Sequence, residues 1–310
     1  MKAKNILYSA SVIALSAMML GACSTTASKS GSDSSAKTSQ TSKKTSSEKA
    51  KTTNVKKIAG ADLKDGTYKL EEDNYYNGYK VVMSMTVKDG KITKTSYDNV
   101  NKDGKSKADD AAYEKQMKKF VKIGPKEYIP KLAKEFADNG SNSSGVQVVS
   151  GATSSTLTMR NYINQLVQAA QKGDTDTIHI NNNKPMKDGT YKLEQKNYYN
   201  GYRQVFTLVV KKGKVADLKY DQINKDGMSK TKDAKYEKAM KKVNGVGPKE
   251  YIPKLAKEFM DAKGNMEKVQ VVSGATHSSN DFISYVEQLM NAAQKGDTKT
   301  IIVDNIVTKE

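Results

Sequence analysis

The chain repeats itself at a fixed offset, and this duplication limits what it can fold into more than any other feature. The stretch DGTYKL begins at Asp65 and again at Asp188, an offset of 123 positions. With the same offset, GPKEYIPKLAKEF begins at Gly124 and again at Gly247, and VQVVSGAT is repeated as well. Repeats of solenoid proteins are about 20–50 residues long. The longer period therefore predicts a duplicated domain, with two copies of one module.

The first residues lie ahead of the duplication and are typical of an export signal. Lys2 and Lys4 precede an apolar stretch at 6–19 that is too short for a comfortable membrane span. The stretch is followed by LGAC, in which small residues precede Cys23, the only cysteine of the chain. This pattern resembles the bacterial lipobox, whose cysteine is lipidated, with acyl chains such as palmitate, and becomes the first residue of the mature protein. We therefore expect a lipoprotein signal peptide at 1–22 and a lipid anchor at Cys23.

The segment at 23–57 consists mostly of Ser, Thr, Lys, Ala and Gly. Such a segment cannot bury enough apolar surface to offset the entropy lost on ordering. We expect a disordered tether that holds the folded part outside the cell, at a membrane where more than one acyl chain gives stable anchoring. The remainder then divides into module 1, at 58–182, and module 2, at 183–310.

Charge and cysteine content exclude several classes of function. The chain has 52 basic and 34 acidic residues, for a net charge of +18, but its only arginines are Arg160 and Arg203. Arginine is the usual reader of base edges and clamp for phosphates. The basic balance therefore predicts attraction to polyanions in general and no nucleic-acid binding. A single cysteine excludes a disulfide framework within the chain and cysteine-rich metal sites, and we expect no metal centre.

Within a module, the hydrophobic periods change in a fixed order. Val81, Met83, Met85 and Val87 alternate with less apolar residues, as in a half-buried strand, and a DG turn follows. An antiparallel sheet with packed helices makes the fold class α+β. The expected elements of module 1 are strands at 66–71, 81–87, 91–97 and 146–149, and helices at 111–120, 128–136 and 157–171.

The repeated SGAT segment joins the last strand of each module to an amphipathic helix. Its Gly and Ala carry almost no side chain, and Ser154, Ser155 or Thr156 can cap the helix that follows. Thr153 then lies at a helix N-terminus, where backbone N–H groups and the helix dipole favour an anion. On these residues alone, a capped turn without any ligand remains the alternative.

The order of strands, DG hairpin, SGAT and helix resembles the FMN-binding domain family. In that family, the Thr of SGAT carries FMN through a phosphoester, installed by an exported flavin transferase of the ApbE type. The resemblance implies covalent FMN at Thr153 and at Thr276, hence two FMN groups for each chain. The flavinylation motif is then completed by Ser150, Gly151, Ala152, Ser273, Gly274 and Ala275.

Two such domains behind a lipobox and a tether are similar to lipoproteins of flavin-based extracellular electron transfer in Gram-positive bacteria. This resemblance implies a monomeric electron carrier at the extracellular face of the cell membrane, and not an enzyme with a specific organic substrate. Electrons would come from a quinol-linked membrane donor and leave to ferric iron or soluble flavins. The alternative is a non-redox lipoprotein whose duplicated basic domains bind cell-wall polyanions.

Some positions depart from the family pattern or suggest further contacts. Gln147 and Gln270 stand where many members have Asp, and His277 follows the second SGAT motif, where Ser or Thr is common. These departures bear on how fully each site is flavinylated. Polar loops and helix methionines are hypothetical flavin contacts, with polar turns, solvated lysines and core packing as the alternatives: Asn101, Ser106, Lys107, Met117, Asn224, Ser229, Lys230 and Met240.

Overall fold

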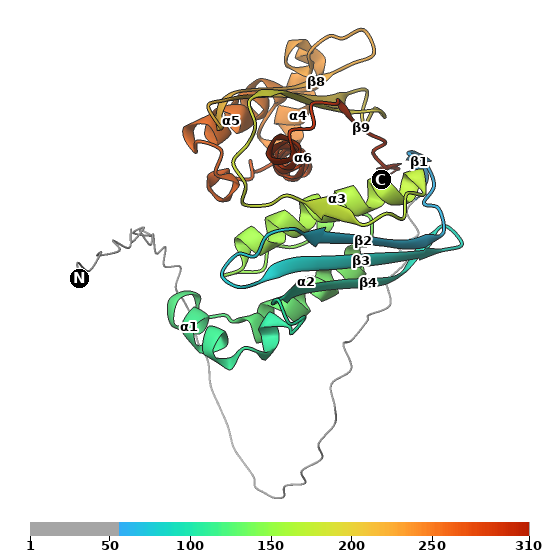
Figure 1. The fold of residues 1–310 in the computed structure, drawn as a ribbon. Helices are drawn as coiled ribbons and strands as arrows, with labels where there is room; N and C mark the ends of the chain where they lie inside the picture. The colour runs from blue at the N-terminus through green and yellow to red at the C-terminus, as the bar shows by residue number, and fades with distance from the viewer. Residues whose placement is uncertain (1–55, 310) are drawn as a thin grey trace, which may run out of the picture. The chain divides into compact units, whose positions relative to one another are not determined.

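The computed structural model describes residues 56–309. The predicted signal peptide, the Cys23 anchor and nearly all of the predicted tether lie outside these residues. Each half of the described chain is an antiparallel sheet with packed helices (Figure 1), so the predicted α+β class and the two tandem domains are confirmed.

The sheet of module 1 is built on a three-stranded meander. β2 (Gly66–Glu72) pairs antiparallel with β3 (Lys80–Lys88), which pairs with β4 (Lys91–Val100). β3 alternates between buried and half-buried residues, because successive side chains point to opposite faces of a sheet. A short parallel strand, β5 (Ile178–Ile180), joins β2 at the edge and gives the order β4-β3-β2-β5.

Three helices of module 1 follow the meander in sequence. α1 (Ala111–Val121) is capped by Asp110, and α2 (Pro125–Asn139) begins with a proline, which lacks only an N–H that the first turn leaves unpaired. α2 contacts β4, whereas α3 (Thr153–Lys172) contacts β2 and β3. Tyr68, Phe136 and Tyr162, from a strand and both of these helices, belong to one buried core and are almost fully buried.

Module 2 repeats this arrangement, with its strands in the order β8-β7-β6-β9. The last helix has the same length in both modules, and it ends at a glycine in the left-handed conformation in each. The elements are β6 (Gly189–Gln195), β7 (Arg203–Lys211), β8 (Lys214–Ile223), α4 (Ala234–Asn244), α5 (Pro248–Asp261), α6 (Thr276–Lys295) and β9 (Ile301–Val303).

The two modules contact each other through α3 and α6. Arg160 donates to Asn280 at 2.9 Å, and eight residues further along each helix Gln168 and Gln288 exchange two side-chain hydrogen bonds. Asn161 also donates to Asn291 at 2.7 Å, so the bonded pairs do not follow a single register along the two helices. In addition, β1 (Lys57–Ala59) pairs with β10 (Val307–Thr308), which ties the start of the described chain to its end.

The sequence-based prediction of a strand at 146–149 is wrong. This segment has no strand partner, although Val146 and Val149 are buried. The Gln147 and Val149 N–H groups donate to the side chains of Glu135 and Thr156, so neither is free for a neighbouring strand. The copy at 269–272 has the same contacts and is not a strand either. No helix within residues 56–309 is long and apolar enough to cross a bilayer.

Candidate functional site

The SGAT turn of each module is pressed against the junction of the two preceding helices. Gly151 has a φ of +78°, and a Cβ at this position would lie 2.5 Å from a methyl group of Ile123 and 3.0 Å from the carbonyl oxygen of Val121. At Gly274 the φ is +79°, and a Cβ would lie 2.2 Å from the carbonyl oxygen of Asn244. Only glycine fits both the conformation and the space.

Neither α3 nor α6, the helices that follow the SGAT turns, is capped by a side chain. The prediction that Ser154, Ser155 or Thr156 caps α3 is therefore wrong. α3 begins at Thr153 itself, with Ala152 at the N-cap position. The hydroxyl of Thr156 accepts from the Val149 N–H at 3.2 Å and donates to the Ala152 carbonyl at 3.0 Å. It therefore ties the helix to the turn and leaves the N–H groups of the first turn available.

The second copy has the same construction. α6 begins at Thr276 without a side-chain cap, and Ser279 bonds the Val272 N–H and the Ala275 carbonyl as Thr156 does in module 1. The repetition of this detail with a different residue type shows that the hydroxyl, and not the threonine methyl group, fixes the turn.

Thr153 and Thr276 are exposed, and within residues 56–309 no hydrogen bond engages either hydroxyl. Each hydroxyl lies at the first position of a 20-residue helix whose N-terminal N–H groups have no side-chain cap. A helix N-terminus favours negative charge. The residues present therefore fit a phosphoester at Thr153 and at Thr276.

The other motif residues frame these hydroxyls. Ser150 and Ser273 are exposed, whereas Ala152 and Ala275 are buried. Of the positions that depart from the family pattern, Gln147 and Gln270 are exposed. Their backbone N–H groups donate to carboxylates on the preceding helix, Glu135 at 2.8 Å and Glu258 at 2.9 Å. These main-chain bonds could be made by any residue except proline, and the Gln147 side chain also donates to the Gly145 carbonyl at 2.9 Å.

Most of the other hypothetical flavin contacts have structural partners. Asn101 accepts from two N–H groups of its own loop, and Ser106 donates to Asp98 and caps a short helix at 107–109. Asn224 and Ser229 make the corresponding contacts in module 2. Met117 and Met240 are half-buried and pack against the cores.

Lys107 and Lys230 each lie in a cage of two tyrosine rings. The Lys107 Nζ is 4.0 Å from the ring centre of Tyr113 and 5.4 Å from that of Tyr79. The Lys230 Nζ is 4.2 Å from the ring centre of Tyr236 and 5.2 Å from that of Tyr202. At such distances the ring faces attract the ammonium groups.

The cages differ in one hydrogen bond, which links Lys230 through Gln222 to α6. The Lys230 Nζ donates to Gln222 Oε1 at 2.8 Å, and Gln222 Nε2 donates at 3.2 Å to Ser278, two residues after Thr276. Asn99 stands at the position of Gln222 in module 1 and makes no such bond to Lys107. We did not single out Gln222 from the sequence, although aligning the two copies reveals the difference.

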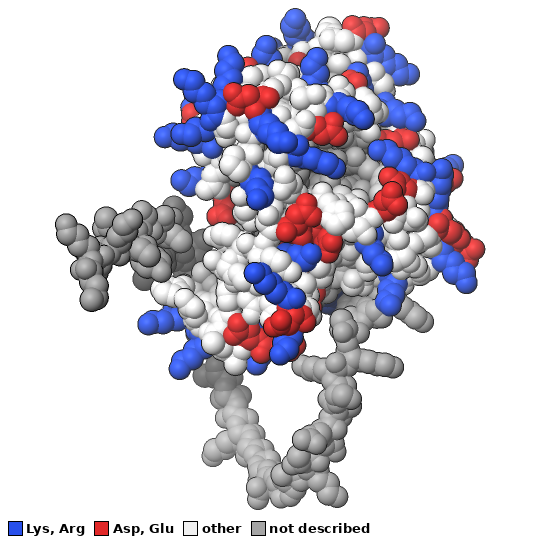
Figure 2. Space-filling model, viewed as in Figure 1, with Lys and Arg blue, Asp and Glu red and all other residues white. Residues whose placement is uncertain are grey.

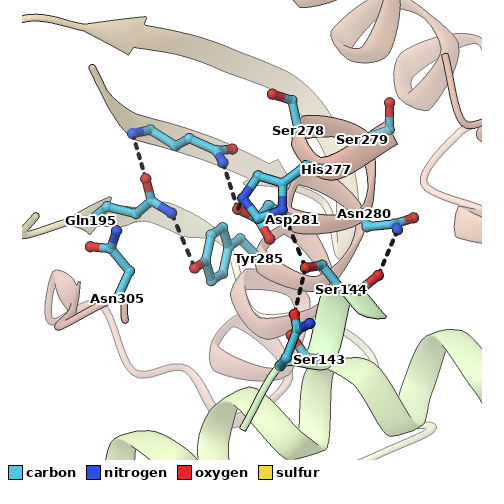
Figure 3. A network of polar contacts seen from close by, with 12 residues as sticks. Ser143, Ser144, Gln195, His277, Ser278, Ser279, Asn280, Asp281, Tyr285 and Asn305 are labelled. Atoms are coloured by element: carbon cyan, nitrogen blue, oxygen red, sulfur yellow. Dashed lines mark hydrogen bonds and ion pairs between the residues drawn. The ribbon is translucent and has the colours of Figure 1, made fainter. Parts of the chain in front are cut away.

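The first turns of α3 and α6 also contact the other module. His277 Nδ1 lies 3.3 Å from the Ser144 hydroxyl, and Asn280 donates to the Ser144 carbonyl at 3.0 Å. Figure 3 shows both side chains directed from α6 toward Ser144. Reciprocally, Ser154 of α3 bonds Glu267 of module 2. Both candidate attachment sites therefore lie next to the seam, as we call the interface that α3 and α6 form between the modules.

A buried carboxyl group in this seam makes stability depend on pH. The Oε2 atom of Glu287 is buried without a hydrogen-bond partner, and burial raises the pKa of Glu287 to about 8, with Arg160 opposing the rise. The folded state thus holds this proton more tightly than the unfolded state. Its contribution to stability is complete below the unfolded pKa of 4.5 and is lost as the pH rises toward 8.

Glu287→Gln should therefore raise the free energy of unfolding on the order of a few kcal/mol at pH 8, and much less at pH 5. Urea unfolding of both proteins at the two pH values measures this. Asp226→Asn, at an exposed position, is the control and should leave the pH dependence unchanged. A gain that is equal at pH 5 and pH 8 would contradict the assignment.

Fold and site together define a class: a duplicated α+β domain that presents a threonine hydroxyl at an uncapped helix N-terminus in each copy. The sequence profile of the FMN-binding domain family matches residues 76–168 and again residues 199–291. The chain belongs to this family and contains two FMN-binding domains.

Two known proteins resemble single modules of the chain. The 15 kDa lipoprotein of Treponema pallidum (strain Nichols) is 34% identical over 116 residues, which are 37% of this chain and 82% of that protein. The crystal structure of the CPE2226 protein from Clostridium perfringens has 33% sequence identity and a TM-score of 0.36. That similarity covers 39% of this chain and 98% of the Clostridium protein.

Proposed function

We propose that the chain is a lipid-anchored extracellular electron carrier with one FMN covalently bound at Thr153 and another at Thr276. One observation carries the proposal: in both FMN-binding domains an exposed, unbonded threonine hydroxyl begins a helix whose N-terminus has no side-chain cap. A hydroxyl with a purely structural role would instead bond to the backbone, as those of Thr156 and Ser279 do.

The role of the protein is attachment, orientation and electrostatic tuning. FMN supplies the one- and two-electron redox chemistry when it is bound. Thr153 and Thr276 supply the hydroxyl oxygen for the phosphoester, and the N–H groups of the first helical turn stabilise the phosphate charge. Gly151 and Gly274 keep the turn narrow beside each hydroxyl, which leaves room for a flavin transferase of the ApbE type.

The location outside the cell rests on the predicted lipid anchor at Cys23 and on the Treponema relative, which is itself named a lipoprotein. A covalent bond keeps the cofactor where a dissociable flavin would be diluted away. We propose a monomer at the outer face of a Gram-positive membrane. Its electrons come from a quinol-linked donor in that membrane and leave to ferric iron or soluble flavins.

The surface charge supports acceptors that are anionic. Basic side chains are spread over the visible face of the molecule, with acidic groups between them (Figure 2), and the net charge is +18. A positive potential raises the encounter rate with anions such as ferric chelates, and salt screens the effect. Reduction of an anionic ferric chelate should therefore slow as ionic strength increases.

The test is the intact mass of the chain, exported with and without a flavin transferase. We expect two FMN increments with the transferase and none without it, and in-gel flavin fluorescence that survives denaturation. Ferric reduction by the loaded protein after chemical reduction should follow. If a transferase that is active on a control substrate adds no FMN, the carrier proposal fails and the polyanion-binding alternative gains support.

A further inference from the structure

We propose that Lys230, held in place by Gln222, stabilises the negative charge that FMN bound at Thr276 gains on reduction. Module 2 is then the stronger electron acceptor of the two modules. The inference rests on the proposed function, because it concerns FMN bound at Thr276. It goes beyond that function by assigning different redox potentials to two domains of one family and one chain.

The first step is proximity. Lys230 bonds Gln222, and Gln222 bonds Ser278 in the first turn of α6, so two hydrogen bonds link the ammonium group to the turn that begins at Thr276. Gln222 is itself fixed, because Tyr251 donates to its Oε1 at 2.9 Å and its Nε2 donates to Tyr220 at 2.8 Å. The charge of Lys230 is therefore held at a defined place beside the attachment helix.

The second step is the state of that charge. Lys230 is only 6% exposed, and among the described residues no carboxylate lies within ion-pair distance of it. Burial lowers the pKa of Lys230 to about 8, with the charge of Asp233 opposing the shift. Asp233 accepts instead from the Tyr202 hydroxyl, at 2.7 Å. A buried cation without an ion-pair partner is costly, and an anion nearby offsets this cost.

The third step is the contrast with module 1. Lys107 occupies the equivalent cage but is less buried, and Asn99, one methylene shorter than Gln222, does not reach it. On the helix side, Ser278 accepts from Gln222, whereas the Asn99 side chain accepts from Tyr97. A solvated ammonium group is screened by water, so it stabilises nearby negative charge less than a desolvated one does.

The proposal predicts a pH dependence for module 2 alone. Burial raises the pKa of Tyr202 to about 12, and the pKa values of Tyr236, Tyr251 and Tyr220 are raised as well. Asp233 has a lowered pKa and stays charged. Between pH 7 and pH 9, Lys230 is therefore the group of this cluster that loses its charge. The potential at Thr276 should fall more steeply with pH once Lys230 deprotonates above about pH 8.

The experiment measures potentials one site at a time, in full-length protein loaded with FMN by a transferase. Thr153→Val leaves only the site at Thr276, and Thr276→Val leaves only the site at Thr153. In the first background, Lys230→Met should reduce the preference for the reduced state at least about tenfold, which for a two-electron couple lowers the potential by about 30 mV. Lys107→Met, in the second background, is the matched control and should have a smaller effect.

Exchange of one residue between the modules separates the electrostatic effect from damage to the fold. Gln222→Asn should move the potential at Thr276 toward that at Thr153, and Asn99→Gln should move the potential at Thr153 the opposite way. NMR titration of the lysine side chains gives an independent readout in protein without flavin. In that protein Lys230 should titrate at about pH 8. In loaded protein, reduction of bound FMN should raise the pKa of Lys230 by reciprocity.

The outcomes are distinguishable. Loaded protein in which Lys230→Met and Gln222→Asn leave the potential at Thr276 unchanged overturns this inference and leaves the carrier proposal intact. The same holds if Lys230→Met changes only the yield of attachment, because Lys230 then serves the transferase or the phosphoester. If no FMN is attached to either threonine, the proposed function fails and this inference fails with it.

Discussion

Thr153→Val and Thr276→Val should each remove one FMN increment from the intact mass, and the double variant should carry none. Valine keeps the shape of threonine and lacks only the hydroxyl that the phosphoester needs. Since neither hydroxyl is hydrogen-bonded within residues 56–309, the free energy of unfolding should change by only a few tenths of a kcal/mol, as for exposed substitutions. Intact-mass spectrometry and urea unfolding test the two halves of this prediction.

Thr156→Val is the matched control, because it removes a hydroxyl three residues away in the same helix. Here the Val149 N–H loses its partner, whereas the Ala152 carbonyl still accepts from the Thr156 N–H. An unsatisfied buried group costs about 1–3 kcal/mol. The attachment hydroxyl at Thr153 remains. Thr156→Val should therefore lower stability and keep its FMN increment at temperatures where the protein is folded. If Thr153→Val retained both increments, the attachment site would be elsewhere.

The duplication made much of the fold predictable from one sequence. A pattern that occurs twice at one offset is tested twice, and the alternation in β3 recurs in β7. The meander, the long last helix and the α+β class depend on local periodicity, so they were within reach. The site at Thr153 and Thr276 was found because a short motif stood at equivalent places in both copies.

Other features depend on contacts that periodicity does not encode. β5 is three residues long and exists because β2 offers it a parallel edge. The segment at 146–149 was predicted as a strand, but the side chains of Glu135 and Thr156 accept from the N–H groups that a neighbouring strand would need. Candidate caps were misassigned because the Thr156 hydroxyl accepts from Val149 and donates to the Ala152 carbonyl, so it satisfies none of the free N–H groups in the first turn of α3.

The seam between the modules was also outside the reach of the sequence, since nothing local shows that α3 and α6 are partners. Its polar pairs, such as Gln168 with Gln288, look like ordinary solvent-exposed residues in the sequence. Gln222 was missed for a related reason: its importance lies in three side chains that converge on it from other elements, those of Lys230, Tyr251 and Ser278. Differences between the copies are the signal that sequence does offer for such residues.

Replacing the glycine of the SGAT turn by alanine should lower the stability of the protein, and by different amounts in the two modules. Gly151→Ala forces a side chain into a left-handed conformation and against Ile123, whose side chain can move. We expect a loss of about 1–3 kcal/mol, as for other strained backbone positions. Gly274→Ala meets the carbonyl oxygen of Asn244 at 2.2 Å. This carbonyl cannot move unless the end of α4 moves with it. Overpacking should therefore add about 1–3 kcal/mol to the loss of stability expected for Gly151→Ala.

Gly201→Ala isolates the conformational part of this cost. Gly201 has a φ of +83°, close to that of Gly274, but no atom lies within 4 Å of where its Cβ would be. Urea unfolding should therefore rank the losses Gly201→Ala, Gly151→Ala and Gly274→Ala from smallest to largest. Flavin loading should fall in the same module as each turn substitution, because displacing the turn displaces its threonine. Equal losses of stability at Gly151 and Gly274 would mean that the Asn244 carbonyl moves aside as easily as the Ile123 side chain. The contact between the turn and Asn244 would then not fix the position of the turn.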